Sequence, residues 1–227
     1  MIVSIHQPNY IPWLGFFHKV LLSDIYVVFD DVQFPRGKDY ANRNQIKTNN
    51  GQLWLTIPIS GKGDLKLWNQ MTISNHEWVD KHLMNIKSFY KKSKYFNLYY
   101  EDLELIYKKN HSHICDLNVD LIRYFLSCLE CNTKIVFSSD LKVQSTGLDK
   151  IVHILELLHA TKYISGSGNG STRYIDENVF KQKNIELIWQ QYKHPIYKQQ
   201  FGDFIPYMSI IDLLFNHGPD SRNIILS

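Results

Sequence analysis

Apolar positions along the chain alternate between short continuous runs and stretches with helical spacing. The first 30 residues predict a buried strand at 2–5, a helix opened by Pro12, and a second strand at 25–30. The apolar face of that helix consists of Trp13, Phe16, Phe17, Val20 and Leu21. A strand, a helix and a strand within about 30 residues have the size of a βαβ unit.

A block of helices follows a strand at 52–58 that Pro58 ends. Ser74 and Glu77 have the spacing of a capping box, which predicts a helix with one apolar side. Two further helices are expected at 98–130, with a break at 110–113. No stretch rich in Pro, Gly or Ser flanks this block, so we interpret it as a cap or insertion at about 75–130.

The α/β alternation then returns, with strands at 134–137, 163–165 and 185–189. Helices are expected after 145–149 and after Asp176, and a last one from Pro206 to Gly218. Strands that alternate with helices favour a mostly parallel, Rossmann-like sheet with helices on both faces. We therefore expect one α/β domain over residues 1–227.

Composition and charge exclude several classes of protein. The chain is 44% hydrophobic and 21% charged, which is typical of a globular protein. It has no apolar run of membrane-spanning length and no signal peptide at its start, so we expect a cytoplasmic location. A net charge of +3 does not demand a nucleic-acid partner. Three cysteines form neither a disulfide framework nor a four-ligand zinc set.

Ligands of open α/β sheets bind beyond the carboxyl ends of the strands, which selects four loops. The first loop joins the strand at 2–5 to the following helix and contains His6, Gln7, Tyr10 and Trp13. Its two prolines restrict the backbone, and the helix N-terminus favours anions. A buried histidine with a purely structural role is the alternative.

The second loop follows the strand at 25–30. Asp30 and Asp31 are suited to binding a metal, orienting a histidine or contacting ribose hydroxyls, and Arg43 is suited to a bidentate contact with phosphate or carboxylate. The alternative is that the carboxylates cap a turn and Arg43 pairs with one of them. No metal-binding motif of the HExxH type is present, and we expect no metal.

The third loop, at 166–172, is rich in small residues and begins with Gly166, Ser167 and Gly168. Backbone N–H groups in such a loop are able to bind phosphate, although the spacing is neither GxGxxG nor Walker A. A flexible surface turn is the alternative.

The fourth loop, at 192–200, offers His194, Tyr197 and Gln199. Ser209 and Asp212 follow on the last predicted helix, one turn apart. A Ser–Asp pair alone is no catalytic triad, so capping or packing is the simpler interpretation of these two residues.

The segment 6–19, His-Gln-Pro-Asn-Tyr-Ile-Pro-Trp-Leu-Gly-Phe-Phe-His-Lys, closely resembles the N-terminal signature of the WbqC-like family. The resemblance extends along nearly the whole chain, through residues 30, 43–44, 54–58, 163–166, 174–176, 192–199 and 209–218. It implies a product of a bacterial O-antigen or other surface-polysaccharide gene cluster that works on nucleotide-linked sugars. Attachment of an acyl or aminoacyl group to an amino sugar fits that context.

On this hypothesis the catalytic residues are His6, Gln7, Asp30 and Asn44. His6 is the general base, because an unperturbed imidazole titrates near neutral pH. Gln7 or Asn44 donates hydrogen bonds to the oxyanion, and Asp30 orients His6 or binds a sugar hydroxyl.

Substrate binding is assigned to the aromatic, basic and glycine-rich positions. Arg43 and the backbone at 166–170 hold the diphosphate, and Trp13 or Tyr10 stacks on the sugar or base. The full set is Tyr10, Trp13, Arg43, Gly166, Ser167, Gly168, Tyr174, Tyr197 and Gln199. The expected partners are a nucleotide sugar and an acyl or aminoacyl donor. No nucleic acid is expected, except a charged tRNA if that is the aminoacyl donor. No other cofactor is assigned, and the oligomeric state stays open.

Two other functions remain open from the sequence. A nucleotidylyltransferase or ligase would need ATP or CTP with Mg²⁺, but His18 comes too late for the second histidine of the nucleotidylyltransferase motif. A non-catalytic sugar-nucleotide-binding protein would bind without turnover.

Overall fold

The structure is a computed structural model that describes residues 1–37, 39–61, 63–168, 172–173 and 175–227. The chain divides into two compact units. Unit 1 consists of residues 1–7, 18–31 and 132–193, and unit 2 of residues 8–17, 32–131 and 194–227. The predicted helical cap at 75–130 lies in unit 2, together with segments that the sequence did not separate from the α/β body. The expected single domain is not tested by this division and stays a prediction.

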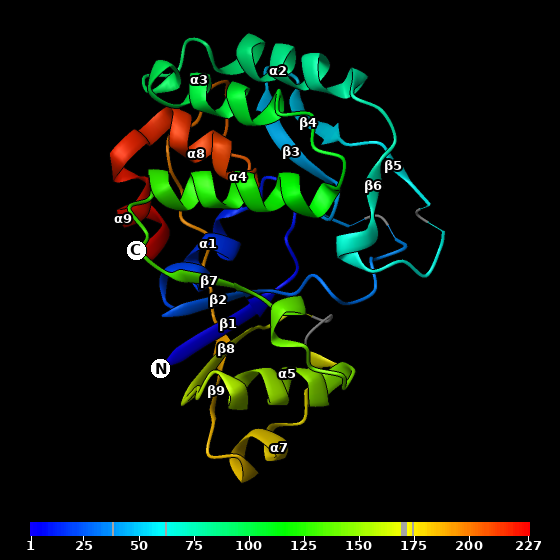
Figure 1. The fold of residues 1–227 in the computed structure, drawn as a ribbon. Coiled ribbons are helices and arrows are strands. Elements are labelled where there is room, and N and C mark those ends of the chain that lie inside the picture. The colour runs from blue at the N-terminus through cyan, green and yellow to red at the C-terminus, as the bar shows by residue number, and fades with distance from the viewer. Residues whose placement is uncertain (38, 62, 169–171, 174) are drawn as a thin grey trace. The chain divides into compact units, whose positions relative to one another are not determined.

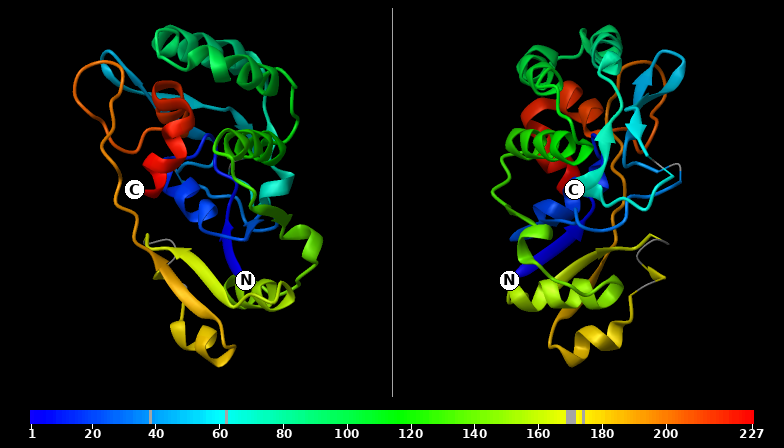
Figure 2. Two further views of the ribbon diagram at one scale, coloured as in Figure 1. Left: turned by 90° about the vertical axis from the view of Figure 1, so that its left-hand side faces the viewer. Right: turned by 45° about the vertical axis from the view of Figure 1, so that its right-hand side comes forward.

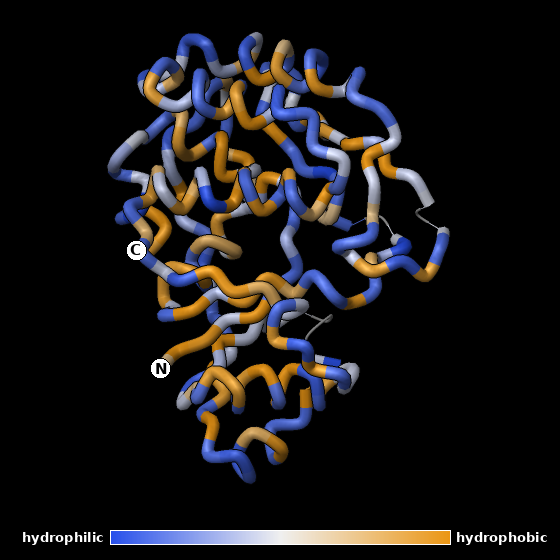
Figure 3. The backbone as a smooth tube through the Cα atoms, in the orientation of Figure 1, coloured by the Kyte–Doolittle hydropathy of each residue, from blue (hydrophilic) through white to orange (hydrophobic). Residues whose placement is uncertain are grey.

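Unit 1 is built on a five-stranded parallel sheet, as predicted (Figure 1). The strand order is β7-β2-β1-β8-β9. Their bounds are β1 Ile2–His6, β2 Ile25–Val28, β7 Lys134–Phe137, β8 Lys162–Gly166 and β9 Glu186–Gln190. The central strands are rich in β-branched residues, and the hydropathy tube shows apolar runs along them (Figure 3).

Helices flank this sheet. α5 (Gly147–Leu157) and α7 (Glu177–Gln182) pack on the face that carries Val3 and Ile5. Successive side chains of a strand point to opposite faces, so Ser4 and His6 belong to the other face. The second half of α1 (Leu14–Leu21) lies on that side (Figure 1). A short 3₁₀ turn, η2 (Ser139–Leu141), follows β7.

Among the described residues, five helices and two antiparallel ribbons lie wholly in unit 2 (Figure 2). The ribbons pair β3 (Arg43–Thr48) with β4 (Gly51–Thr56) and β5 (Ile59–Ser60) with β6 (Thr72–Ile73). The helices are α2 Glu77–Tyr90, α3 Phe96–Tyr107, α4 Ile114–Cys128, α8 Ile210–His217 and α9 Ser221–Leu226, with 3₁₀ turns η1 at Trp68–Gln70 and η3 at Gly218–Asp220. No helix of the described residues is both long and apolar enough for a membrane span.

One strand of unit 2 was missed, and two local predictions there were wrong. The strand β3 was missed, because its polar sequence Arg-Asn-Gln-Ile-Lys-Thr lacks a continuous apolar pattern. α2 begins at Glu77, whose backbone N–H is bonded to Asn75 Oδ1 at 3.2 Å, so Ser74 does not cap it. α8 begins only at Ile210 rather than at Pro206; it ends at its C-cap Gly218 as predicted, but a further short helix, α9, follows it.

Candidate functional site

The carboxyl edge of the unit 1 sheet contains a topological switch point. The chain passes from β1 through β2 to β7 on one side of the sheet, and then to β8 and β9 on the other. The order in which the chain adds strands therefore reverses between the neighbouring parallel strands β1 and β8. Open α/β sheets bind their ligands at such a point. β1 ends at His6 and β8 at Gly166, so the first and third predicted loops start at adjacent strand ends.

His6 carries a neutral imidazole. Its Nδ1 lies 2.8 Å from the carbonyl oxygen of Gln7, which can only accept, so Nδ1 holds the proton and Nε2 the lone pair. Burial, reinforced by the charge of Lys19, lowers the pKa of His6 to about 3. The expectation of a histidine that titrates near neutral pH was therefore wrong, because the sequence does not reveal how far the ring is buried.

Lys19 is the functional candidate that the sequence reasoning missed. It lies on α1 with 3% of its surface exposed, and burial lowers its pKa to about 7. The charge of Lys19 contributes to the lowered pKa of His6, so the two groups interact electrostatically. Ordinary lysines stay charged well above neutral pH, whereas this amine exchanges its proton near pH 7. The only sequence signal is its position three residues after Phe16, at the border of the apolar stripe.

Ser4 adds a further polar group to the same face of the sheet as His6. It is fully buried, and its hydroxyl has no hydrogen-bond partner among the described residues. Buried polar atoms without partners are rare, and they gather where a ligand or water completes the site.

Asp30 and Asp31 lie where the second loop begins, and both are bonded within unit 1. Asp30 is 3% exposed and accepts hydrogen bonds from Ser139 Oγ at 2.7 Å and from Ser139 N and Ser138 Oγ at 3.0 Å each. Asp31 accepts from the buried Lys150 Nζ at 2.6 Å. These bonds tie the end of β2 to η2 and α5, which matches the turn-capping alternative for the carboxylates.

The third loop is described only in part. Gly166 is the last residue of β8, Ser167 and Gly168 follow it, and the N–H of Thr172 donates to the Gly168 carbonyl at 3.2 Å. A Cβ added to Gly168 would meet nothing within 4 Å, so the space beside this backbone is open. The predicted contact Tyr174 lies outside the described residues, as do positions 169–171.

Tyr10 and Asn44, both in unit 2, are structural rather than ligand-facing. Tyr10 is fully buried, with its hydroxyl 2.9 Å from His82 Nδ1 and 2.5 Å from the hydroxyl of Tyr107. The prediction that Tyr10 stacks on a ligand was wrong, because no face of its ring is open. Asn44 is also fully buried and donates to the carbonyls of Ile11 at 2.8 Å and Tyr10 at 3.3 Å. Its amide therefore holds the loop, which leaves the predicted oxyanion contact unsupported.

Arg43 begins β3 and lies over the ring of Trp54, with the guanidinium carbon 4.1 Å from the ring centroid. Its Nε donates to the Asp39 carbonyl at 3.3 Å. Trp13 stacks on His194 with a centroid distance of 6.3 Å and an interplanar angle of 11°. A Cβ on Gly15 would lie 2.2 Å from the Trp13 ring, which explains the glycine of the first motif.

Tyr197 and Gln199 of the fourth loop anchor that loop to itself and to α8. The Tyr197 hydroxyl donates to Asp212 Oδ2 at 2.9 Å, and the Tyr90 hydroxyl donates to Oδ1 at 2.8 Å. Gln199 bonds to both the N–H and the carbonyl of Ile205. Asp212 is fully buried, and burial raises its pKa. Its function is packing, as the sequence favoured.

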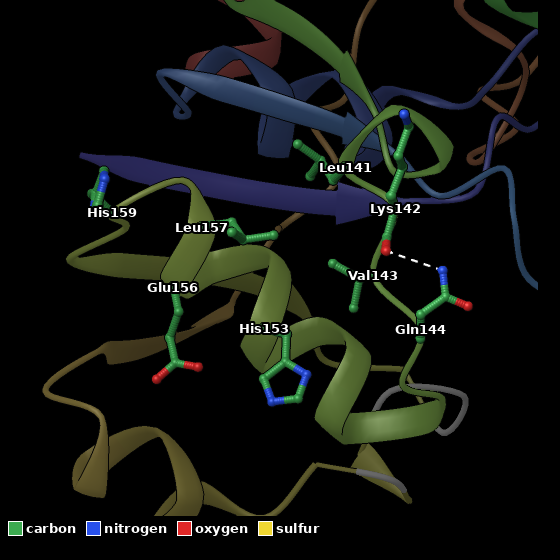
Figure 4. Close-up of a pocket in the computed structure, with 8 residues that line it drawn as sticks. All are labelled: Leu141, Lys142, Val143, Gln144, His153, Glu156, Leu157 and His159. Carbon is green, nitrogen blue, oxygen red and sulfur yellow. Dashed lines mark hydrogen bonds between the residues drawn. The ribbon is translucent and has the colours of Figure 1, made fainter.

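A surface pocket of about 520 Å³ lies in unit 1 beside α5 (Figure 4). His153 and Glu156 of α5 border it, and Glu156 forms an ion pair with Lys183 at 2.7 Å. None of the predicted site residues lines it, so we do not assign the chemistry to this pocket.

Comparison with known proteins identifies the family. A family model described as the WbqC-like protein family matches residues 7–224. The chain belongs to the WbqC-like family. It is also 32% identical over 226 residues to a Mycobacterium tuberculosis protein described as "Uncharacterized protein Rv1507c", covering 98% of this chain and 96% of that protein. No solved structure matches the chain. The resemblance inferred from segment 6–19 is thus confirmed, and the matched region includes parts of both units.

Proposed function

We propose that this WbqC-like protein transfers an acyl or aminoacyl group to the amine of a nucleotide-linked amino sugar, in surface-polysaccharide synthesis. The reaction centre is the switch point of the unit 1 sheet. The observation that carries the proposal is a buried imidazole at the end of β1, His6, whose pKa is lowered in part by the charge of a buried amine, Lys19, of pKa about 7. Two titratable groups with pKa values far from their ordinary range are typical of catalytic sites.

Proton transfer is the step that these residues serve. The sugar amine attacks the acyl carbonyl carbon, a C–N bond forms, and the nitrogen must lose a proton. A general base works best when its pKa lies near the working pH, so Lys19 is better suited than His6 to accept that proton. When the tetrahedral intermediate collapses, the carbonyl carbon loses the donor's leaving group, and the Lys19 ammonium returns the proton to it.

His6 then has a positioning role. With Nδ1–H fixed on the Gln7 carbonyl, its Nε2 lone pair has one direction and accepts a hydrogen bond without taking the proton. In this proposal the Gln7 side chain donates to the oxyanion, and the backbone at 166–168 contacts the diphosphate.

The experiment is an N-acylation assay with mass-spectrometric detection of the product. Substrates are UDP- and dTDP-linked amino sugars, each offered acetyl-CoA or a charged tRNA. We expect Lys19→Met to lower kcat by about 10²-fold or more. His6→Asn, which retains a fixed donor and acceptor, should retain more activity than His6→Ala. Lys134→Met, which removes an exposed lysine from β7, is the matched control.

The pH profile distinguishes the two candidate bases. If Lys19 accepts the proton, kcat/KM rises with pH through about 7, since only the neutral amine is active. A profile that is flat between pH 5 and 9 would contradict this assignment. Product formation that requires ATP–Mg²⁺ and releases pyrophosphate would instead favour a ligase. Sugar-nucleotide binding without turnover would favour a binding protein.

A further inference from the structure

A pocket of about 480 Å³ lies between β4 and α2 in unit 2. Four of the residues that line it occupy one face of α2, because they are spaced i, i+3, i+4 and i+7. These are Trp78, Lys81, His82 and Asn85. The strand side is formed by Trp54 and its neighbours on β4, which pairs with β3 in a two-stranded ribbon.

Trp54 presents an exposed aromatic surface at this pocket. Its side chain is 39% exposed, although burial of an indole is among the largest apolar gains available to a fold. Arg43 covers part of the ring at 4.1 Å from the centroid, and the ring of Tyr40, itself 40% exposed, lies 6.0 Å away. The arrangement holds the indole in one orientation while its surface stays accessible.

Polar groups without hydrogen-bond partners among the described residues line the same pocket as Trp54. Trp78 is only 6% exposed, yet its indole Nε1–H has no acceptor among the described residues. Such a buried, orphaned donor is rare and indicates that something else supplies the acceptor. Lys81 is exposed and Asn85 is half-buried. Among the described residues, neither side chain makes a hydrogen bond, so both are available to a ligand in the pocket.

One wall of the pocket is formed by the buried, uncharged side chain of His82. His82 Nδ1 lies 2.9 Å from the Tyr10 hydroxyl, and the His82 ring packs edge-on against Trp78 with a centroid distance of 5.0 Å. Burial lowers the pKa of His82 to about 4, so it is neutral under physiological conditions. This wall is already formed before a ligand binds, so ordering the His82 side chain costs little conformational entropy on binding.

We propose that this pocket binds a sugar ring, with Trp54 stacked on the C–H face of a pyranose. Sugars combine an apolar C–H face with hydroxyl groups that both donate and accept hydrogen bonds. The indole matches the first property, and the N–H of Trp78, the amide of Asn85 and the ammonium of Lys81 match the second. The proposal concerns binding alone and does not depend on the transferase chemistry of unit 1.

The test is saturation-transfer difference NMR on the full chain. The probes are the methyl glycosides of glucose, N-acetylglucosamine, N-acetylgalactosamine and rhamnose, with UDP as a nucleotide without sugar. We expect transfer to the ring C–H protons of at least one glycoside. Trp54→Ala should weaken that binding about tenfold, and Trp54→Phe should recover part of it. Phe201→Ala removes a ring that is also 39% exposed and should leave binding unchanged.

Three results would overturn the proposal. They are no transfer to any glycoside, equal loss in the Trp54 and Phe201 variants, and binding of UDP at Trp54 in place of the glycosides. If Trp54→Ala does not fold, as judged by circular dichroism, Trp54→Phe and Asn85→Ala carry the same comparison. Because the readout is binding, failure here is distinguishable from failure of the acylation assay.

Discussion

The pKa of Lys19 makes a quantitative prediction about stability. In the unfolded chain this lysine titrates at 10.5, whereas burial holds it at about 7 in the folded protein. Between these two pH values the unfolded state binds more protons than the folded state. The free energy of unfolding therefore rises with pH from about 7 to 10.5 and does not change further, through this group, below 7.

The magnitude follows from the size of the shift. A difference of roughly 3.5 pKa units corresponds to about 4 to 5 kcal/mol, an upper bound for an amine that is 3% exposed. Lys19→Met removes the cost of burying the amine and keeps its apolar stem. We expect this variant to be more stable than the natural chain at pH 7, by up to that amount, and the gap to close by pH 10.5.

The assay is urea denaturation of both proteins at intervals between pH 6 and 10.5, followed by far-UV circular dichroism. The difference between the two curves isolates Lys19, since all other groups titrate in both proteins. Lys134→Met should track the natural chain at every pH. A constant difference between pH 7 and 10.5 would falsify the idea that Lys19 is buried with a depressed pKa, and with it the proton-transfer role.

Three further predictions concern unit 2 and are measured by urea denaturation. Gly15→Ala should destabilise the chain by about 1–3 kcal/mol, because its Cβ would lie 2.2 Å from the Trp13 ring, and unchanged stability would contradict this packing. Asp212→Ala should cost about 2–6 kcal/mol by leaving two buried tyrosine hydroxyls without their acceptor, and a loss below 1 kcal/mol would refute the network. Asn44→Ala should cost about 1–3 kcal/mol by freeing two buried carbonyls, with catalytic constants of the folded fraction unchanged if the residue is purely structural.

Elements with strong periodicity were predicted well, and the reason is local. The strands β1, β2, β7, β8 and β9 each fall within a residue or two of the apolar runs that predicted them. Asp176 caps α7 through a 2.9 Å bond to the Asn178 N–H, as its position predicted. β3 was missed because its stability comes from pairing with β4 and from burial of Asn44 and Lys47, neither of which its own sequence reveals.

The candidate site was predicted in location but not in chemistry. The rule for parallel sheets selected His6 and Gly166 from strand ends alone, and these residues do end neighbouring strands. The same reasoning passed over Lys19, since a lysine at the end of an amphipathic helix looks like an ordinary solvated charge. Its pKa depends on what the folded chain packs around the amine.

By itself, the sequence determined the parallel α/β sheet, the positions of most of its elements and membership of the WbqC-like family. Those features follow from side-chain period and from a local motif, both of which are read within a few residues. The tertiary structure alone decided which polar groups are buried and bonded. Tyr10 meets His82 across 72 positions and Tyr90 meets Asp212 across 122, so their environments arise only when distant segments pack together. Burial of this kind sets pKa values and hydrogen-bond partners, and therefore it separates the residues that hold the fold from those left for chemistry.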